Sequence, residues 1–324
     1  MTSSTKNAQA KTQSTAIAVT KAFVAGKLGI NEVELVSLLA NHPWPKLSYR
    51  HLDSEERDQV ILGILSSIDA AKLRVAGKND NTVWERGWGE ILTKVKTEGF
   101  NPSILRPQYF DHHRIMRFDG DFIDGGDAHF NYAYDQLLRR LFFAHYLKGA
   151  AKIVELGCGT GTSQLILAEL FPQAKLVASD WAKPSQELIR IIGQYVKRDI
   201  KPVNFNMLTL EGWDELTIDH ESCVLTVHAL EQLGGNMEPL MDKLIAAKPR
   251  FCLHLEPILE LYDETKLFDH VAIKYHRHRN YLQGWLTRLR ALAREGKVEI
   301  LEERRLGFGG RDHEAFTAVK WRAC

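Results

Sequence analysis

Residues 152–161 read Lys-Ile-Val-Glu-Leu-Gly-Cys-Gly-Thr-Gly, a short apolar run that opens into a glycine-rich turn. Residues 163–170 follow with helical spacing of their apolar side chains, so the stretch predicts a strand, a turn and a helix in that order. Glycine lets the backbone of such a turn approach a ligand closely, and the next helix points its free N–H groups at the same place. In an α/β sheet, this is the end of the strands at which ligands bind.

Downstream of this turn, short apolar runs alternate with helical segments, which is the pattern of βαβ units and a parallel sheet. Strands are expected at residues 152–156, 176–179, 203–205, 223–227, 251–255, 298–301 and 315–321, and helices at 163–170, 185–196, 238–247 and 280–296. A loop from Gly307 to Gly310 joins the last two strands without a helix, so they are expected to form an antiparallel hairpin. The expected fold class is therefore α/β, a Rossmann-like, doubly wound, mostly parallel sheet with an antiparallel last strand.

The chain before this sheet predicts a helical N-terminal region. Helical spacing of apolar residues occurs at 16–27, 31–39, 54–71, 82–97 and 134–147. The stretch 100–129 is rich in Asp, Gly, His and Arg and is long for a plain connection, so a functional loop or lid is expected there. The expected division is a disordered tail over residues 1–15, a cap, lid or dimerisation region over 16–133, and the sheet domain over 134–324.

Composition excludes several classes of function. The 324 residues are 44% hydrophobic and 26% charged with a net charge of +1, so no nucleic acid and no membrane surface is expected as a partner. No apolar run approaches the roughly 20 residues that span a bilayer, and the N-terminus lacks the apolar segment of a signal peptide. The four cysteines are scattered without a C-x-x-C pair, which favours a reducing compartment, so a cytoplasmic location is expected.

Two acidic residues beside the turn indicate the kind of ligand. Glu155 lies two places before Gly157, and Asp180 ends the second strand, where a carboxylate can accept hydrogen bonds from both ribose hydroxyls of an adenosine. A dinucleotide fingerprint needs Gly or Ala where Thr162 stands, and a carboxylate beside the turn would repel a pyrophosphate. The pattern favours a nucleoside that has an ammonium group and no phosphate, namely S-adenosylmethionine.

From residue 134 onward the chain resembles the class I S-adenosylmethionine-dependent methyltransferases of the small-molecule type. VELGCGTG is similar to their first motif, VASDWA to the second, NFNMLT to the third and VLTVHALEQL to the fourth. The resemblance implies an enzyme that transfers a methyl group from S-adenosylmethionine, and it implies binding of this cofactor by Glu155, Gly157, Cys158, Gly159, Gly161, Asp180, Trp181, Asn206 and Met207. The family usually has Asp where Asn206 stands, although an amide oxygen could also accept a bond from the adenine amino group.

The acceptor side is less well defined. An oxygen or nitrogen acceptor that starts protonated needs a general base, and His228 and Glu231 follow the fourth strand as candidate catalytic residues. His228 is preferred because of its titration range, with a structural histidine as the alternative. Two polar clusters, at 109–134 (with His112 and His113) and 275–281, are expected to shape the pocket. The candidate substrate-binding residues are Arg114, Tyr132, Tyr134, Glu256, Tyr275, Arg279 and Tyr281.

Arg and Tyr donors suit a carboxylate, so the expected acceptor is an amino acid, a small organic acid or a sugar acid, methylated on O, N or S. Two alternatives stay open: a solvated helix start at 275–281, and a carboxylate of Glu256 that only caps a turn. Two other functions also stay open, a dinucleotide-dependent oxidoreductase and a non-catalytic cofactor-binding subunit. No metal is expected, because no Cys or carboxylate stands at ligand spacing from the paired histidines. The helical N-terminal half makes a homodimer a further expectation.

Overall fold

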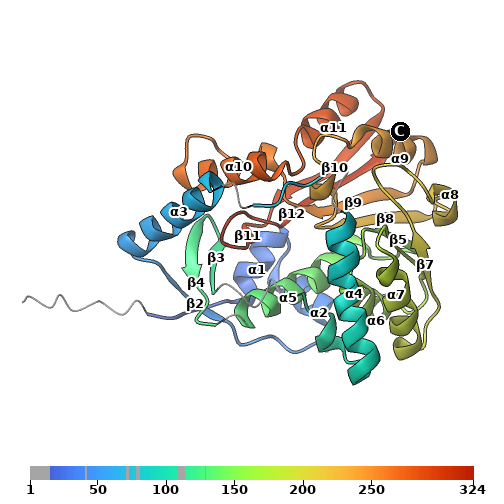
Figure 1. Ribbon diagram of the computed structural model, residues 1–324, viewed down its shortest axis with the longest axis horizontal. Helices are drawn as coiled ribbons and strands as arrows, with labels where there is room; N and C mark the ends of the chain where they lie inside the picture. The colour runs from blue at the N-terminus through green and yellow to red at the C-terminus, as the bar shows by residue number, and fades with distance from the viewer. Residues whose placement is uncertain (1–14, 41, 71–72, 78–80, 108–113, 128) are drawn as a thin grey trace, which may run out of the picture.

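A seven-stranded sheet forms the centre of the protein, whose computed structural model describes residues 15–40, 42–70, 73–77, 81–107, 114–127 and 129–324. Its strand order is β10-β12-β9-β8-β5-β6-β7 (Figure 1). The strands are β5 (Lys152–Leu156), β6 (Lys175–Asp180), β7 (Ile200–Asn204), β8 (Ser222–Val227), β9 (Phe251–Glu256), β10 (Val298–Arg305) and β12 (Thr317–Ala323). All pairings from β9 to β7 are parallel, and β12 lies antiparallel between β9 and β10. The predicted α/β fold class, with its antiparallel last strand, is confirmed.

Helices cover both faces of this sheet. Successive residues of a strand point to opposite faces, so Ile153 joins the core under the helices α5, α6 and α7, and Val154 joins the core under α9 and α11. The helices of this half are α5 (His129–Tyr146), α6 (Thr162–Leu170), α7 (Lys183–Val196), α8 (Trp213–Leu216), α9 (Glu238–Ala247), α10 (Leu267–Arg279) and α11 (Trp285–Arg294), with 3-10 turns η3 (Leu230–Leu233) and η4 (Leu259–Leu261). The β–α alternation therefore buries both sheet faces.

The N-terminal region contains four helices and also a sheet that the sequence pattern did not predict. The helices are α1 (Lys21–Leu28), α2 (Glu32–Leu39), α3 (Ser54–Asp69) and α4 (Asn81–Glu98), followed by the 3-10 turn η1 (Pro102–Leu105). The sheet has the order β1-β2-β4-β3-β11, with β1 (Ile17–Ala18), β2 (Ser48–His51), β3 (Ile115–Phe118), β4 (Asp121–Asp124) and β11 (Phe308–Gly309). The stretch expected as an irregular loop thus contains the β3–β4 hairpin.

The small sheet joins the two halves of the chain. Its strand β11 belongs to the connection between β10 and β12, residues 306–316, which we call the strap. Phe308 of the strap pairs with Phe118 of β3, and both side chains lie in the apolar core that also holds Ile153 of the large sheet. The strap therefore does more than turn the expected hairpin, because it ties the C-terminal strands to the N-terminal region.

The aromatic and basic stretch 275–281 lies at the end of one helix, whereas the alternative interpretation placed it at the start of another. A single helix over 280–296 was predicted, but α10 ends at Arg279, and α11 begins only at Trp285. Asn280 takes the left-handed conformation with φ of 49° and caps the carboxyl end of α10. The stretch is thus a helix end, at which positive side chains interact favourably with the helix dipole, and not a solvated helix start.

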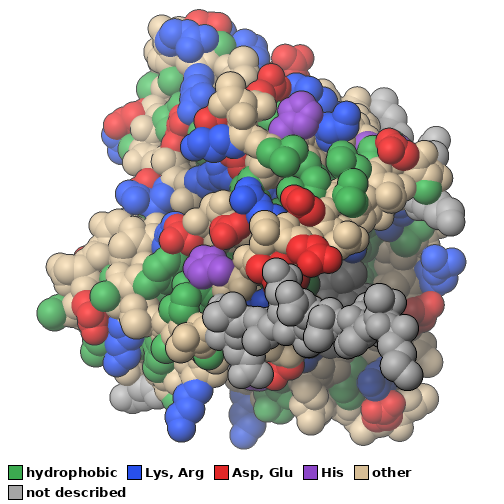
Figure 2. Space-filling model, turned by 90° about the vertical axis from the view of Figure 1, so that its left-hand side faces the viewer, with side chains coloured by type: hydrophobic (Ala, Val, Ile, Leu, Met, Phe, Trp, Pro, Cys, Tyr) green, Lys and Arg blue, Asp and Glu red, His purple; other side chains and the backbone are tan. Residues whose placement is uncertain are grey.

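The outer surface matches the balanced composition. On the face that carries α3 and the small sheet, Lys and Arg side chains are interspersed with Asp and Glu (Figure 2). In the described ranges, no helix has both the length and the apolar character needed to cross a membrane.

Candidate active site

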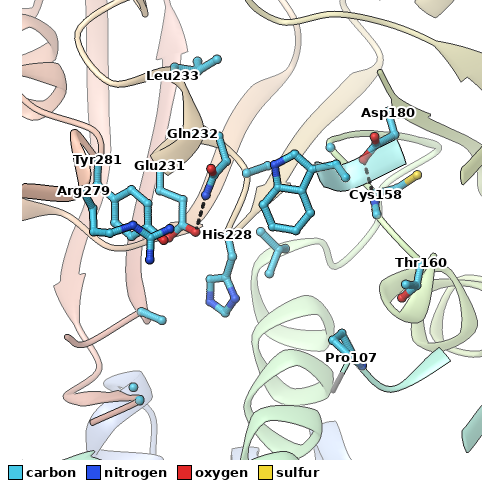
Figure 3. A pocket seen from close by; sticks show the side chains of 18 of the residues that line it. Pro107, Cys158, Thr160, Asp180, His228, Glu231, Gln232, Leu233, Arg279 and Tyr281 are labelled. Atoms are coloured by element: carbon cyan, nitrogen blue, oxygen red, sulfur yellow. Dashed lines mark hydrogen bonds between the residues drawn. The ribbon is translucent and has the colours of Figure 1, made fainter. Parts of the chain in front are cut away.

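A cleft with a volume of about 460 Å³ opens at the carboxyl ends of β5, β6 and β8. This is the place where ligands bind in open α/β sheets, and the volume is ordinary for a small-molecule site. Its walls come from the turn after β5, the end of β6, the loop after β7, η3, the end of α10, the strap and α4. Asp180 and Cys158 lie on one side of the cleft, Glu231, Arg279 and Tyr281 lie on the other, and His228 lies between them (Figure 3).

The glycine turn is held tightly against the end of β6. The backbone N–H groups of Gly157 and Cys158 both donate to the carbonyl of Ser179, at 2.8 Å each. Gly157 has φ of 75°, and a Cβ there would overlap the side chain of Ala229. A Cβ on Gly159 would stand 3.2 Å from the ring of Trp88. Both glycines are therefore required by conformation and by close approach.

Asp180 fastens the same turn from the neighbouring strand. Its Oδ2 accepts a hydrogen bond from the Gly159 N–H at 2.9 Å, and its Oδ1 accepts one from the Ala182 N–H at 2.9 Å. Burial raises the pKa of Asp180 to about 6, and the two backbone hydrogen bonds act in the opposite direction. A carboxylate oxygen can accept more than one bond, so both oxygens keep capacity for further donors in the cleft.

Seven of the nine predicted cofactor residues line the cleft: Gly157, Cys158, Gly159, Asp180, Trp181, Asn206 and Met207. Glu155 and Gly161 lie behind the wall. The Glu155 carboxylate is buried and accepts a hydrogen bond from the Gln164 side chain, and burial raises its pKa. Gly161 is the N-cap residue just before α6, with φ of 84°. A direct role for these two residues stays a prediction.

Asn206 already uses its amide oxygen in the local turn. That oxygen accepts a hydrogen bond from the Leu208 N–H at 2.9 Å. Phe205, which the sequence analysis did not select, lines the same part of the cleft. The loop after β7 thus lines the cleft next to the end of β6, where the Phe205 N–H donates to the Asp180 carbonyl at 3.1 Å.

His228 lines the cleft immediately after β8 and adopts φ of 52°, a conformation that is costly for most non-glycine residues. Its Nδ1 lies 3.3 Å from Nη2 of Arg139, and the edge of its ring packs on Phe316. Burial and the charge of Arg139 hold the pKa of His228 well below its usual range, while the Ala315 backbone acts in the opposite direction. The ring is therefore neutral at physiological pH.

Glu231 lines the cleft from η3, with its carboxylate accepting a hydrogen bond from the Gln232 amide at 2.8 Å. Burial, and next the nearby charge of Glu256, raise the pKa of Glu231 to about 8. Glu256 itself is fully buried under the floor of the cleft, where it accepts a hydrogen bond from the Ala229 N–H at 3.0 Å. Glu256 therefore influences the cleft through Glu231 and the backbone. It was predicted to bind a substrate directly, but it does not line the cleft.

Three of the predicted substrate-binding residues meet at the far end of the cleft. Tyr275, Arg279 and Tyr281 all line it, and Nη1 of Arg279 donates to the Tyr275 hydroxyl at 2.9 Å. The guanidinium also lies over the ring of Tyr281, 4.6 Å from the ring centroid. The Nε atom of Arg279 is buried without a hydrogen-bond partner among the described residues. This end of the cleft is thus suited to bind an anionic or hydrogen-bond-accepting group.

The remaining predicted substrate residues lie elsewhere. Arg114 pairs with Asp124 at 2.6 Å, Tyr132 lies under the guanidinium of Arg106, and Tyr134 is packed in an aromatic cluster with Phe118 and Phe308. None of the three lines the cleft, although Asn131 and Asp135 of α5 do. Tyr109, His112 and His113 lie outside the described residues.

Several cleft residues had no sequence motif to reveal them. Trp84 and Trp88 of α4 cover the glycine turn, and their rings lie 5.1 Å apart. Asp135 and Arg139 are charged residues inside the apolar face of α5, which was the one available indication that this helix does more than pack. His313 enters the cleft from the strap.

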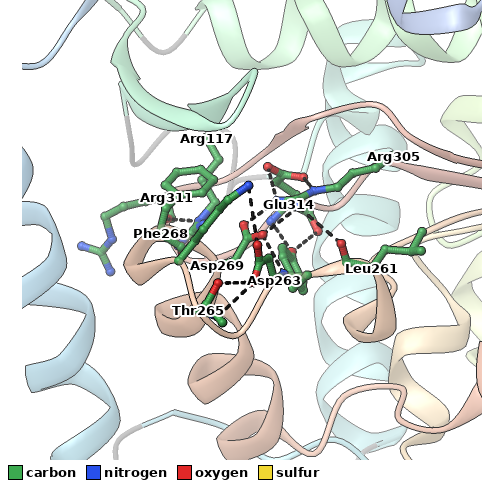
Figure 4. A network of polar contacts seen from close by, with 11 residues as sticks. Arg117, Leu261, Asp263, Thr265, Phe268, Asp269, Arg305, Arg311 and Glu314 are labelled. Atoms are coloured by element: carbon green, nitrogen blue, oxygen red, sulfur yellow. Dashed lines mark hydrogen bonds and ion pairs between the residues drawn. The ribbon is translucent and has the colours of Figure 1, made fainter.

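The strap is anchored from behind by a network of charges (Figure 4). Arg305 pairs with Asp269 at 2.6 Å and also with Glu314, while Arg117 donates to the backbone carbonyls of Phe268 and Arg311. These contacts hold the strap against α10. Nδ1 of His313 shares a hydrogen bond of 3.0 Å with Nε2 of His276, which fixes the His313 ring in the wall of the cleft. In the described ranges, no group of three His, Cys, Asp or Glu side chains is arranged to hold a metal ion.

No protein-family model matches the chain, and no curated protein matches it. Among solved structures, the chain is similar to a SAM dependent methyltransferase from Aquifex aeolicus, with 13% identity, a TM-score of 0.41, and coverage of 69% of this chain and 100% of that one. It is also similar to N,N-8-amino-8-demethyl-D-riboflavin dimethyltransferase from Streptomyces davawensis, with 12% identity, a TM-score of 0.44, and coverage of 95% and 90%.

A third similar structure is an O-methyltransferase family protein from Burkholderia thailandensis, with 15% identity, a TM-score of 0.40, and coverage of 94% and 88%. All three are described as methyltransferases, the class that the motifs resemble. At such identities and TM-scores these likenesses carry no conclusion about activity, so the function has to be inferred from the cleft itself.

Proposed function

We propose that this protein is an enzyme that transfers a methyl group from S-adenosylmethionine to a small polar acceptor. The observation that carries the proposal is the Asp180 carboxylate, which fastens the glycine turn through the Gly159 N–H while facing the cleft. A carboxylate in this position has acceptor capacity for the two ribose hydroxyls of a nucleoside. A dinucleotide is disfavoured because Thr162 stands where its fingerprint needs Gly or Ala.

The residues of the cleft fit this cofactor. Because Gly157 and Gly159 have no side chains, Ala229 and the Trp88 ring approach the turn closely, and the rings of Trp88 and Trp181 line the same region of the cleft. Phe205, Asn206 and Met207 would border the adenine. When bound, S-adenosylmethionine supplies a methyl group on a positively charged sulfur, which leaves with the electron pair of the broken carbon–sulfur bond.

The chain's own residues have three tasks in this reaction. They hold the acceptor in line with the methyl carbon, exclude water and remove the proton of an O–H or N–H acceptor. Glu231 is the group best placed for the third task, because its carboxylate lines the cleft and its pKa of about 8 lies near neutral pH. The lone pair of the acceptor forms the new bond to carbon, and the released proton goes to Glu231.

The acceptor we propose carries a carboxylate, as an amino acid, a small organic acid or a sugar acid does. Arg279 with its unpartnered Nε, together with the Tyr275 hydroxyl, supports this choice at the end of the cleft opposite Asp180. A guanidinium offers two parallel donors that match a carboxylate. The volume of the cleft, about 460 Å³, is ordinary for a small-molecule site, so the proposed acceptor is a free small molecule.

Calorimetry with S-adenosylhomocysteine and with NADH tests the cofactor. We expect binding of the first ligand only, weakened by about 1–3 kcal/mol in Asp180→Ala, because the ribose hydroxyls lose their acceptor. The matched control is Asp219→Ala, which removes a carboxylate paired with Lys152 at the opposite end of the strands. Binding of NADH alone, or equal effects of the two substitutions, would contradict the proposal.

A further inference from the structure

We propose that His228 is a fixed hydrogen-bond donor in the cleft, with its proton on Nε2, and that it is not the general base. The arrangement that fixes it is a buried chain from Asp135 through Arg139 to His228. The position of the proton on the ring follows from the protein's own contacts. The role of this donor, to hold an oxygen of the methyl acceptor, rests on the proposed function.

The chain starts from a buried ion pair within α5. Nε of Arg139 donates to both carboxylate oxygens of Asp135, at 3.0 and 2.9 Å, and Nη1 lies 3.3 Å from the Ser163 hydroxyl. The side chain of Arg139 is 8% exposed and that of Asp135 is 1% exposed. The guanidinium is thus held in one orientation, with Nη2 left to face His228.

The direction of the next hydrogen bond follows from the chemistry of arginine. A guanidinium has donors and no acceptor, so the contact of 3.3 Å between Nη2 and His228 Nδ1 requires Nδ1 to carry the lone pair. A neutral imidazole has one proton, which must then be on Nε2. Nε2 therefore has no lone pair with which to take a proton from an acceptor.

The groups around the ring agree with this assignment. Among the described residues, Arg139 and His313 interact electrostatically with it, and the positive charge of Arg139 opposes a second proton on the ring. The Ala315 backbone favours a proton on the ring, as expected for a nearby carbonyl. Nε2 is buried and makes no well-aligned hydrogen bond with the described residues.

The Ala315 backbone offers Nε2–H only a poorly aligned acceptor, so this buried donor is incompletely satisfied until a ligand oxygen takes its place. His228 lies between the side of the cleft with Asp180 and the side with Glu231 and Arg279 (Figure 3). A donor in this position would bind a carbonyl, carboxylate or hydroxyl oxygen next to the methylated atom. The methyl acceptor is then a molecule with such an oxygen next to its nucleophilic atom. His228 is a positioning residue, because it holds this oxygen.

The first test is the nitrogen NMR spectrum of the histidine rings in the full-length protein. We expect the His228 ring to show an unprotonated Nδ1 and a protonated Nε2 from about pH 5.5 to pH 8, with no titration. The signals are assigned by their loss in His228→Gln and, if that variant does not fold, by their contacts with the Phe316 ring in the wild type. A proton on Nδ1, or a titration within this range, would overturn the proposal.

The matched pair of variants is Arg139→Gln and Arg140→Gln. Both remove a buried arginine from the same helix, but Arg140 pairs with Glu169 away from the cleft. We expect the Nε2–H form to be lost or mixed with the other tautomer only in Arg139→Gln. An unchanged His228 spectrum in that variant would show that Arg139 does not fix the ring.

The second test measures release of S-adenosylhomocysteine with a metabolite extract. A glutamine keeps an N–H donor but cannot act as a base, so we expect His228→Gln to lower the rate less than about tenfold, whereas loss of a general base costs about 10²–10⁴-fold. A loss above a hundredfold would overturn the proposal. If the protein does not bind S-adenosylhomocysteine, but the ring has the expected tautomer, the proposed function fails and the assignment of the ring stands.

Discussion

The two ends of the cleft are built in different ways. At the Asp180 end, backbone N–H groups and glycines make the contacts, and all of them come from the ends of neighbouring parallel strands. At the Glu231 end, the contacts are made by long side chains from η3, α5, α10 and the strap, which are far apart in the sequence. The geometry of the Asp180 end is thus set by the backbone of the fold, whereas that of the Glu231 end is set by individual side chains.

This difference has consequences for specificity and for evolution of the site. A backbone cradle can change little without disturbing the sheet, so it suits a ligand that stays constant. Side chains such as Arg279, Glu231 and His313 can be exchanged while the sheet remains, so they suit a ligand that varies between proteins of one fold. We therefore expect substitutions at the Asp180 end to act on cofactor affinity and those at the Glu231 end to act on turnover.

The largest expected effect is that of Glu231→Gln. Glutamine keeps the shape of the side chain but cannot accept the proton, so turnover should fall by about 10²–10⁴-fold. Affinity for S-adenosylhomocysteine should change little, because Glu231 lies across the cleft from Asp180 (Figure 3). The measurement combines S-adenosylhomocysteine release, with a metabolite extract as the source of acceptor, and calorimetry.

The control for this prediction is Glu238→Gln, which neutralises an exposed glutamate of α9 outside the cleft. Its turnover should equal that of the wild type. A fall in cofactor affinity as large as the fall in turnover would remove the distinction between the two ends. If the acceptor is a thioether, which has no proton to lose, Glu231→Gln should stay active. That result would contradict the role of Glu231 as a base.

The same difference explains what could be predicted from sequence. The strand β5, the glycine turn and Asp180 are contiguous or one βα unit apart, so their order along the chain reports their place in space. The predicted α/β class follows from this local regularity. Seven of nine cofactor residues line the cleft for the same reason.

The acceptor end could not be predicted as well, because its partners meet only through tertiary structure. Arg114 and Tyr134 have the expected polar and aromatic character, yet Arg114 pairs with Asp124 of β4, and Tyr134 of α5 packs on Phe308 of the strap. The strands of that hairpin have four residues each, and β11 has two, which is too short for an alternation pattern to show. Arg139 could be suspected only as a charge on an otherwise apolar helix face.

A second prediction tests whether the glycine turn is shaped by sterics as well as by backbone conformation. Gly157→Ala and Gly149→Ala replace glycines with nearly equal φ, 75° and 73°, so both should lose about 1–2 kcal/mol of unfolding free energy. Only Gly157→Ala also drives a methyl group into Ala229, which should cost about 1–3 kcal/mol more. Urea unfolding measures this difference.

Calorimetry then completes the comparison of the two glycines. Affinity for S-adenosylhomocysteine should fall in Gly157→Ala and stay unchanged in Gly149→Ala, because a Cβ on Gly149 meets no atom within 4 Å. Equal stability and equal affinity in the two variants would mean that the turn tolerates a side chain. The backbone cradle would then not be the basis of the Asp180 end.

The smallest expected effect concerns the buried carboxylate below the cleft. Burial and then the charge of Glu256 raise the pKa of Glu231 to about 8, and a base must be ionised to act. Turnover should therefore rise with pH toward that value, as a property of the interacting pair of carboxyls. Glu256→Gln keeps an acceptor for the Ala229 N–H but removes the charge, so the rise should move to lower pH.

The buried carboxyl of Glu256 should also make the unfolding free energy depend on pH. Burial raises the pKa of Glu256 from 4.5 to about 7, so between these values the folded protein keeps a proton that the unfolded chain releases. The contribution to stability is complete below pH 4.5 and is lost as the pH rises through 7. The unfolding free energy of Glu256→Gln should fall less steeply over this window than that of the wild type, with Glu238→Gln as the control. The pH–rate curve of Glu256→Gln could stay where it is in the wild type while the stability changes as expected. The charge of Glu256 would then not raise the pKa of Glu231, and Glu231 would not be the group that limits turnover at low pH.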